Sequence, residues 1–270
     1  MKKVRLDLRL VQDAFFPSRE AAQRYIRAGK VLVDEVVIDK PGALIDPVAP
    51  LRVQRQETEF AGRGGEKLEG ALAEFGIAVR GLIAADLGAS TGGFTDCLLK
   101  RGVQKVFAVD VGRGQLVYRL QTDPRVVVMD NTNCRYLEAR HLGGPVDLVV
   151  ADLSFISIKT VYLAIQSILK PEGQAVLLIK PQFEVGKGKV GKKGLVRHQE
   201  DHEEVLLDFY RFFREAQWAV RHIAPSIIQG KTGNIEFLIH VMPNPLVESI
   251  PPEAVLDAVG RAHRKENEPR

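Results

Sequence analysis

Four charged residues that are far apart in the chain stand beside apolar runs, where a charge is costly to bury. Asp152 and Lys180 each come directly after an apolar, strand-like run. Glu236 interrupts a third such run, and Lys67 lies among apolar residues with helical spacing. Buried charges are tolerated where they pair, and open α/β sheets bind ligands at the carboxyl ends of strands. Two lysines and two acids together could remove a proton and stabilise the negative charge left behind, so we expect one site.

The elements that must position these residues alternate between helices and strands from residue 66 onward. A helix at 66–75 with apolar residues at i, i+3, i+4 and i+7 comes first. Nearly all-apolar strands then alternate with helices, which predicts an α/β fold with a mostly parallel sheet covered on both faces. The turn at 230–233 predicts a final hairpin, so at least one strand is antiparallel. The expected strands are 82–87, 105–111, 126–129, 146–151, 175–179, 219–228 and 234–241, and the clearest helices are 94–101, 158–169 and 200–216.

Residues 1–58 predict a separate, small α+β module. Helices are expected at 5–15 and 19–28, with Ser18 as the N-cap and Gly29 just past the second helix. A hairpin at 31–38 and a short strand near 51–53 follow. A linker at 59–65 then leads to the second domain, 66–270. Basic residues near the second helix would form one basic face or remain ordinary solvated charges: Arg19, Arg24, Arg27 and Lys30.

Composition and charge limit the classes of function. The chain has 270 residues, of which 45% are hydrophobic and 27% charged, so a sizeable core is feasible. The formal net charge is only +4, but residues 180–198 hold six Lys or Arg against one acid, and residues 1–58 hold eleven against eight. Such local positive charge suits a polyanion partner. A Gly-rich loop carries part of it, on Lys187, Lys189, Lys192 and Lys193.

Cysteine usage and hydropathy point to the compartment. Two cysteines, Cys97 and Cys134, favour a reducing environment, and no Cys/His spacing resembles a zinc site, so we expect no metal. The N-terminus lacks the apolar core of a signal peptide, and no charge-free apolar run approaches the roughly 18 residues of a membrane helix. We therefore expect a soluble, cytoplasmic protein without stable membrane association. The oligomeric state is left open.

A glycine-rich segment at 86–94 follows the first strand of the second domain and opens a helix. Glycines there let the backbone approach a ligand, and Asp110, at the end of the next strand, could accept hydrogen bonds from both hydroxyls of an adenosine ribose. Ser90 stands where the dinucleotide pattern has its middle glycine, so S-adenosylmethionine fits better than NAD; a plain strand-to-helix turn is the remaining alternative. The predicted cofactor residues are Asp86, Gly88, Ser90, Gly92, Gly93, Phe94, Asp110, Asp130 and Asn131.

Five motifs in this chain resemble those of the TlyA family, in the family's order. They are Gly-Gly-Glu-Lys-Leu at 64–68, the segment 86–95, Ala-Asp-Leu-Ser-Phe-Ile-Ser at 151–157, Lys-Pro-Gln-Phe-Glu-Val-Gly-Lys-Gly at 180–188, and Gly-Asn-Ile-Glu at 233–236. The resemblance covers nearly the whole chain. It implies a Rossmann-like, FtsJ-type methyltransferase domain whose seven-stranded sheet has an antiparallel last strand. The N-terminal module resembles an RNA-binding domain first seen in a small-subunit ribosomal protein.

The family's function and site are implied by the same resemblance. TlyA proteins are ribose 2′-O-methyltransferases of ribosomal RNA, some named hemolysins, which use S-adenosylmethionine. Their Lys-Asp-Lys-Glu tetrad falls on Lys67, Asp152, Lys180 and Glu236. The substrate expected is a cytidine of the large subunit, with the small subunit as a second possibility. Relatives have a glutamate at Asp130 and an aromatic-Val-Ser where 60–62 is Phe-Ala-Gly, which leaves adenine recognition and the linker's role open.

The chemistry of 2′-O-methylation assigns a role to each member of the tetrad. A ribose hydroxyl is a poor nucleophile, so it needs a base beside it and positive charge near the developing alkoxide. We expect Lys180 to be the base and Lys67 the cation that favours its neutral form and orients the hydroxyl. Asp152 and Glu236 would position the lysines. The basic face of the N-terminal module and the Lys-rich loop would hold RNA phosphates.

Three other functions compete with this hypothesis. A membrane-active hemolysin would need a membrane span or a strongly amphipathic cationic helix, and the sequence shows neither. A noncatalytic RNA-binding assembly factor would not need an intact tetrad. Methylation of a base amine usually relies on an Asn/Asp-Pro-Pro-aromatic motif, whereas residues 152–155 are Asp-Leu-Ser-Phe. The target nucleotide, and whether the substrate is naked RNA or an assembled particle, stay open.

Overall fold

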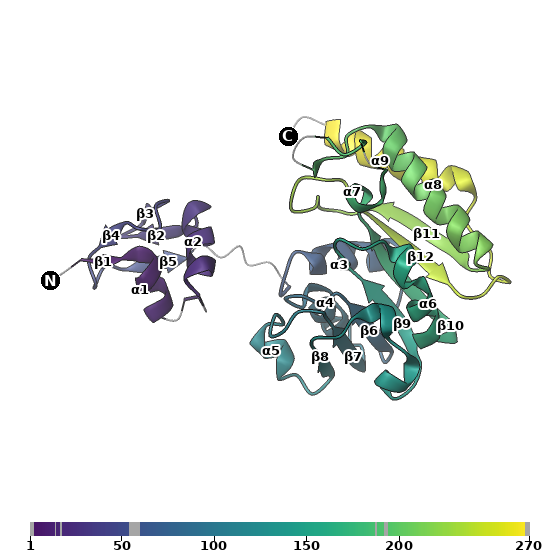
Figure 1. Cartoon of the computed structure of the whole chain (residues 1–270), viewed down its shortest axis with the longest axis horizontal. Helices are drawn as coiled ribbons and strands as arrows, with labels where there is room; N and C mark the ends of the chain where they lie inside the picture. The colour runs from purple at the N-terminus through teal and green to yellow at the C-terminus, as the bar shows by residue number, and fades with distance from the viewer. Residues whose placement is uncertain are drawn as a thin grey trace. The chain divides into compact units, whose positions relative to one another are not determined.

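The computed structural model describes residues 3–13, 15–16, 18–53, 60–186, 188–191 and 194–267, without the side chains of residues 21, 24 and 265–267. The chain divides into two compact units, Met1–Thr58 and Glu59–Arg270 (Figure 1). The polar stretch at 54–58 that precedes the predicted linker lies outside the described residues.

The first unit packs two helices against short antiparallel strands. Leu6, Leu10, Ile26 and Val31 are fully buried and form its core. Asp7 is also fully buried, and its carboxylate accepts hydrogen bonds from Arg5, Arg19 and Gln23, which hold its pKa far below the ordinary value. β3-β2-β5 form one sheet and β1-β4 another. The elements are β1 (Val4–Arg5), α1 (Leu6–Gln12), α2 (Arg19–Arg27), β2 (Val31–Val33), β3 (Val36–Val37), β4 (Leu44–Ile45) and β5 (Leu51–Val53).

The second unit is built on a seven-stranded sheet of order β11-β12-β10-β9-β6-β7-β8. Neighbouring strands from β10 to β8 pair in parallel, while β12 is antiparallel to both β10 and β11. This confirms the predicted fold class and its antiparallel last strand. The strands are β6 (Ile83–Leu87), β7 (Lys105–Val109), β8 (Val126–Met129), β9 (Val146–Ala151), β10 (Leu169–Ile179), β11 (Ala219–Pro225) and β12 (Phe237–Met242).

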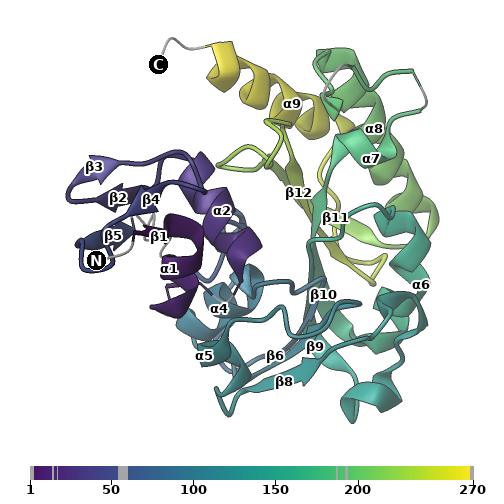
Figure 2. The same ribbon diagram turned by 60° about the vertical axis from the view of Figure 1, so that its left-hand side comes forward.

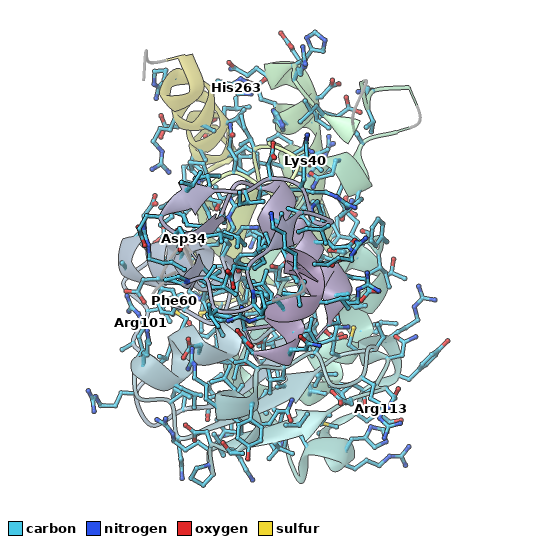
Figure 3. The ribbon with its side chains drawn as sticks, turned by 90° about the vertical axis from the view of Figure 1, so that its left-hand side faces the viewer. Asp34, Lys40, Phe60, Arg101, Arg113 and His263 are labelled. Carbon is cyan, nitrogen blue, oxygen red and sulfur yellow. The ribbon has the colours of Figure 1, made fainter. Side chains whose placement is uncertain are left out.

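Helices cover both faces of this sheet, so its strands are apolar on both sides (Figure 2). Consecutive strand residues alternate between two cores; Ala84 belongs to the core under α3 and α4, and Ala85 to the core under α6, α8 and α9. Between α8 and α9, Nδ1 of His202 lies 2.9 Å from Nε2 of His263. His263 is labelled in Figure 3. The helices are α3 (Gly64–Glu74), α4 (Gly93–Lys100), α5 (Tyr118–Gln121), α6 (Ile158–Ile168), α7 (Pro181–Glu184), α8 (Gln199–Glu215) and α9 (Pro252–Asn267).

Some elements differ from the sequence-based expectation. β11 and β12 are antiparallel neighbours, as expected. However, β11 ends at Pro225 and β12 begins only at Phe237, so their connection is far longer than the expected four-residue turn. α9 (Pro252–Asn267) was not among the helices that the sequence pattern indicated most clearly. In the segment 59–65, expected as a linker, Phe60 is buried in the second unit, and α3 begins at Gly64. None of the helices in the described part of the chain is long and apolar enough to cross a membrane.

Candidate active site

Three of the four predicted site residues lie at one edge of the sheet. β9 and β10 are parallel, so Asp152, directly after β9, and Lys180, directly after β10, emerge at the same edge. β12 runs antiparallel to β10, with Ile179 paired to Phe237. Glu236, directly before β12, therefore arrives at that edge too. The antiparallel direction of β12 places the start of one strand beside the ends of two others.

Helix α3 supplies the fourth residue, Lys67. Its Nζ donates a hydrogen bond to Glu236 Oε2 and forms an ion pair with it. Lys67 is 7% exposed and Glu236 3%, so each charge depends on the other. A β-carbon on Gly230 would lie 2.4 Å from Glu236 Oε1, so a glycine at this position leaves room for the carboxylate.

Lys180 forms a different kind of contact. Its Nζ lies 2.6 Å from Asp152 Oδ1 as an ion pair, but it donates its hydrogen bond to the hydroxyl of Ser154, at 2.9 Å. Asp152 Oδ1 is buried and has no hydrogen-bond partner among the described residues. Asp152 therefore acts on Lys180 through charge, while Ser154 fixes the direction of one N–H bond.

The two lysine–carboxylate pairs are neighbours. A β-carbon on Gly64 would lie 3.5 Å from Asp152 Oδ2. Gly64 precedes Lys67 by about one helical turn, so the first turn of α3 lies against Asp152. The structure thus brings Lys67, Asp152, Lys180 and Glu236 into a single cluster with two cations and two anions. Such a cluster can orient a hydroxyl group and accept its proton.

The glycine-rich segment borders this cluster at the end of β6. Gly88 has φ +84°, and a β-carbon on it would lie 2.8 Å from the carbonyl oxygen of Asp152. Gly92 has φ +97° and precedes the first residue of α4, Gly93. These left-handed conformations favour glycine, and they turn the chain sharply into the helix. The candidate cofactor loop therefore lies directly against the backbone of one candidate catalytic residue, Asp152.

The other predicted cofactor residues interlock at the ends of β7 and β8. Asp110 accepts hydrogen bonds from the backbone N–H groups of Ser90, at 2.8 Å, and Gly112, at 2.7 Å. Asp130 accepts one from the N–H of Gly114, at 2.8 Å. Asn131 has φ +53° and donates its N–H to the Gly112 carbonyl. Three loops at one edge of the sheet are thereby held together.

This donor and acceptor set fits a nucleoside cofactor without a phosphate. Asp110 and Asp130 are both partly exposed, and their carboxylates can accept further hydrogen bonds from hydroxyl or amino groups. Two negative charges would repel a phosphate. S-adenosylmethionine, which has ribose hydroxyls, an adenine amino group and no phosphate, meets these conditions.

Asp86 and Phe94 lie beneath the loop. Asp86 is fully buried; its Oδ2 accepts hydrogen bonds from the N–H (2.9 Å) and the hydroxyl (2.7 Å) of Thr95. Burial, with a smaller contribution from the charge of Asp152, raises the pKa of Asp86 to about 7. Phe94 is 3% exposed and packs against Gly64. Both side chains support the loop and the first turn of α4 from the core side.

Two further residues beside the tetrad were missed by the sequence reasoning. Ser154, already described, is exposed on the molecular surface. Phe155 is 89% exposed, has φ +64°, and its ring centroid lies 5.0 Å from that of Phe183. Both lie in the motif that contains Asp152, and the available indication was a large aromatic residue three positions after a candidate catalytic acid.

Of the predicted RNA-binding residues, some form contacts with other side chains of this chain and some lie outside the described residues. Arg19 pairs with Asp7 at 3.0 Å, and Arg27 donates a hydrogen bond to Gln23. Lys30 lies just past α2. Lys189 pairs with Asp201 at 3.2 Å and with Glu204. The residues Lys187, Lys192 and Lys193, and the side chain of Arg24, lie outside the described part of the chain.

Comparison with known families matches both units. The model of the FtsJ-like methyltransferase family matches residues 60–242, and the model of the S4 domain matches residues 4–47. The first match covers the whole seven-stranded sheet with the tetrad, and the second covers α1, α2 and the first strands.

Individual proteins are similar along most of the chain. YqxC of Bacillus subtilis is 42% identical over 97% of this chain and 95% of its own length. The 16S/23S rRNA (cytidine-2′-O)-methyltransferase TlyA of Mycobacterium tuberculosis is 44% identical over 88% of this chain and 89% of its own. A solved structure of a hemolysin-named protein from Streptococcus thermophilus superimposes with a TM-score of 0.78 at 39% identity, covering 99% of this chain and 98% of that one.

Proposed function

Since the chain belongs to the FtsJ-like methyltransferase family, and within it to the relatives of TlyA, we propose that it methylates the ribose 2′-hydroxyl of a cytidine in ribosomal RNA. The large ribosomal subunit is the first expected substrate and the small subunit the second. The proposal includes S-adenosylmethionine as the methyl donor. A protein that acts on ribosomal subunits works in the cytoplasm, where we place it.

One observation carries the proposal. Two lysine–carboxylate pairs, Lys67 with Glu236 and Lys180 with Asp152, lie at one edge of the sheet, and the backbone of Asp152 lies against Gly88. A methyl donor held by the glycine-rich loop would thus present its methyl group next to a proton acceptor. Alignment of a hydroxyl with that methyl group supplies much of the rate in such a reaction.

The two lysines suit different tasks. Lys67 is hydrogen-bonded and ion-paired to a buried carboxylate, which favours a permanent cation that can orient the hydroxyl and stabilise its oxygen as charge develops. Lys180 has a neutral hydrogen-bond acceptor, Ser154, beside a partly exposed acid. Lys180 is therefore the better proton acceptor. Asp152 and Glu236 hold the two lysines in place.

The cofactor would supply an electrophilic methyl group on a sulfonium centre. Asp110 would accept hydrogen bonds from its ribose hydroxyls, and Asp130 from its adenine amino group. The loop 88–92 would lie against the methionine portion, because its glycines permit close approach of the backbone. Asp86 would keep the start of α4 in position through Thr95.

RNA would be held by the S4 unit and by the Lys-rich segment before α8. Arg19, Arg27 and Lys30 lie in or just after α2. Lys189 lies in the Lys-rich segment itself. Lysine and arginine contacts to phosphates release counterions, so RNA binding should weaken steeply as salt is raised. Binding that is insensitive to salt would contradict this part of the proposal.

The test is transfer of labelled methyl groups from S-adenosylmethionine to purified ribosomal subunits. Lys180→Ala should bind cofactor and RNA almost as well as the wild type, yet lose about 100-fold or more in turnover. Lys170→Ala is the matched control, because Lys170 lies on β10, the strand that Lys180 directly follows, and pairs with Asp147 at 2.6 Å. We expect label in 2′-O-methylcytidine with the wild type and with this control.

Two results would contradict the proposal. Near-wild-type turnover of Lys180→Ala would remove Lys180 from the mechanism. If cofactor binds but the wild type labels neither subunit, isolated ribosomal subunits are not the substrate, and a noncatalytic RNA-binding role or an untested RNA becomes the better hypothesis.

A further inference from the structure

Ser154 makes a contact that the tetrad alone does not explain. It is an exposed residue, yet its hydroxyl takes the hydrogen bond of the largely buried Lys180, at 2.9 Å. Asp152 is closer, with Oδ1 at 2.6 Å from the same Nζ, but this ion pair lacks hydrogen-bond geometry. The direction of the Lys180 ammonium is thus set by a neutral hydroxyl and not by the nearest charge.

The other lysine of the cluster shows the opposite arrangement. Lys67 donates its hydrogen bond to the carboxylate with which it also pairs, Glu236, and both are buried. A carboxylate that is both ion-paired and hydrogen-bonded favours the charged form of its lysine. A hydroxyl can accept an N–H from either the charged or the neutral amine. The difference between Ser154 and Glu236 as partners therefore separates the roles of the two lysines.

We propose that Ser154 is a positioning residue for the methyl transfer, which orients Lys180 so that its lone pair faces the ribose hydroxyl. This inference rests on the proposed function. As the oxygen–methyl bond forms and the sulfur–methyl bond breaks, the hydroxyl proton passes to Lys180 Nζ and the bonding electron pair stays on sulfur. Because Ser154 is exposed, its hydroxyl can then link the protonated Nζ to water, and the proton leaves by that route.

The backbone around Ser154 is built to hold it in place. Two residues before it, the N–H of Asp152 donates to the carbonyl of Leu87 on β6, at 3.1 Å. Directly after it, Phe155 adopts a left-handed φ of +64° and its ring contacts Phe183 of α7. A non-glycine residue in this conformation is strained and persists where its surroundings fix it. The backbone hydrogen bond of Asp152 and the ring contact of Phe155 therefore fix the segment on both sides of Ser154.

Kinetics of three variants test the proposal. Ser154→Ala should lower kcat about 10-fold, with little change in the KM for RNA or the Kd for cofactor, because one hydrogen bond to the base is lost. Ser154→Thr keeps the hydroxyl at an exposed position and should restore most of kcat. Ser157→Ala is the control in the same loop, since the Ser157 hydroxyl accepts from the N–H of Lys159 at the start of α6. Equal losses in Ser154→Ala and Ser157→Ala would indicate loop stiffness only and would overturn the proposal.

A second readout needs neither RNA nor turnover. In protein labelled with ¹⁵N-lysine, the Nζ signal of Lys180, assigned by its loss in Lys180→Arg, should be protected from exchange in the wild type and in Ser154→Thr. It should lose this protection in Ser154→Ala. If Ser154→Ala leaves the signal unchanged, the contact does not orient Lys180. If the wild type transfers no methyl group but shows the expected spectra, the proposed function fails while the orientation of Lys180 by Ser154 stands.

Discussion

Gly88 and Asp152 are in direct backbone contact: a β-carbon on Gly88 would lie 2.8 Å from the Asp152 carbonyl oxygen. The candidate cofactor loop and the candidate catalytic acid are therefore positioned by one another. Gly88→Ala must both strain a left-handed backbone (φ +84°) and push the β9 end away. We expect a loss of about 1–3 kcal/mol in the free energy of unfolding, and weaker cofactor binding, measured by denaturation and by calorimetric titration.

The control for this prediction is Gly76→Ala. Gly76 has φ +65°, and no described atom lies within 4 Å of a β-carbon placed there. The variant shares the backbone strain of Gly88→Ala but not its contact. Equal effects of the two variants on cofactor binding would show that the contact with Asp152 does not matter for the loop.

Removing only one charge of the buried pair Lys67–Glu236 should lower the free energy of unfolding strongly. Lys67→Met leaves the Glu236 carboxylate buried without its cation, and such a change costs about 3–5 kcal/mol of folding stability. Removing both charges, in Lys67→Met with Glu236→Gln, should recover a large part of that loss. Urea unfolding of the three proteins measures it. A double variant as unstable as the single one would contradict the coupling, and both variants should lack methyl transfer.

The stability of the catalytic unit should fall as the pH rises toward neutral because of Asp86. Burial raises the pKa of Asp86 from its ordinary 3.8 to about 7. Between these values the folded protein holds a proton that the unfolded chain has lost, so the unfolded state is favoured increasingly as pH rises through this window. Asp86→Asn cannot ionise. The measurement is the free energy of unfolding of both proteins at pH 5, 6, 7 and 8. The stability of Asp86→Asn relative to the wild type should increase as the pH rises. If the difference between the two proteins does not change with pH, the raised pKa of Asp86 is contradicted.

How much of this could be predicted from sequence depends on the range of the interactions. The strand at 146–151 was predicted with its final bounds because all of its residues except Asp147 are apolar. The tetrad and the glycine-rich loop were predicted from motifs, and the structure brings their residues together. The long connection between β11 and β12 was not predicted, since the turn residues at 230–233 resemble a hairpin locally while Glu236 turns toward Lys67 before the strand starts.

The unpredicted contacts are those between segments far apart in the chain. Nothing in the local sequence indicates that Phe60 packs under Lys100, whose Nζ lies 4.7 Å from the centre of its ring. The same holds for Ser154, because a serine after an acid is common and its importance lies in the distant Lys180. Motif recognition identifies the candidate site residues, whereas the residues that hold them in place require coordinates.

Asn234 links the end of the Lys-rich segment to the residues that lead into β12. It is 1% exposed; its Oδ1 accepts from the N–H of Val196, at 2.9 Å, and its Nδ2 donates to the carbonyl of Gly194, at 2.8 Å. These bonds join the end of the Lys-rich segment to Asn234, which lies two positions before Glu236. Asn234→Ala leaves the buried N–H of Val196 without its partner, which costs about 1–3 kcal/mol, and releases the carbonyl of the exposed Gly194.

If the segment contacts RNA, Asn234→Ala should raise the KM for RNA several-fold and leave the Kd for cofactor near that of the wild type. Asn244→Ala is the matched control, because the Asn244 Oδ1 also accepts a backbone N–H, that of Leu246, but on the loop after β12. Steady-state kinetics with ribosomal subunits and calorimetric titration with cofactor measure both constants. A rise in the cofactor Kd with an unchanged KM for RNA would mean that Asn234 supports the cofactor loop and not the RNA-binding segment.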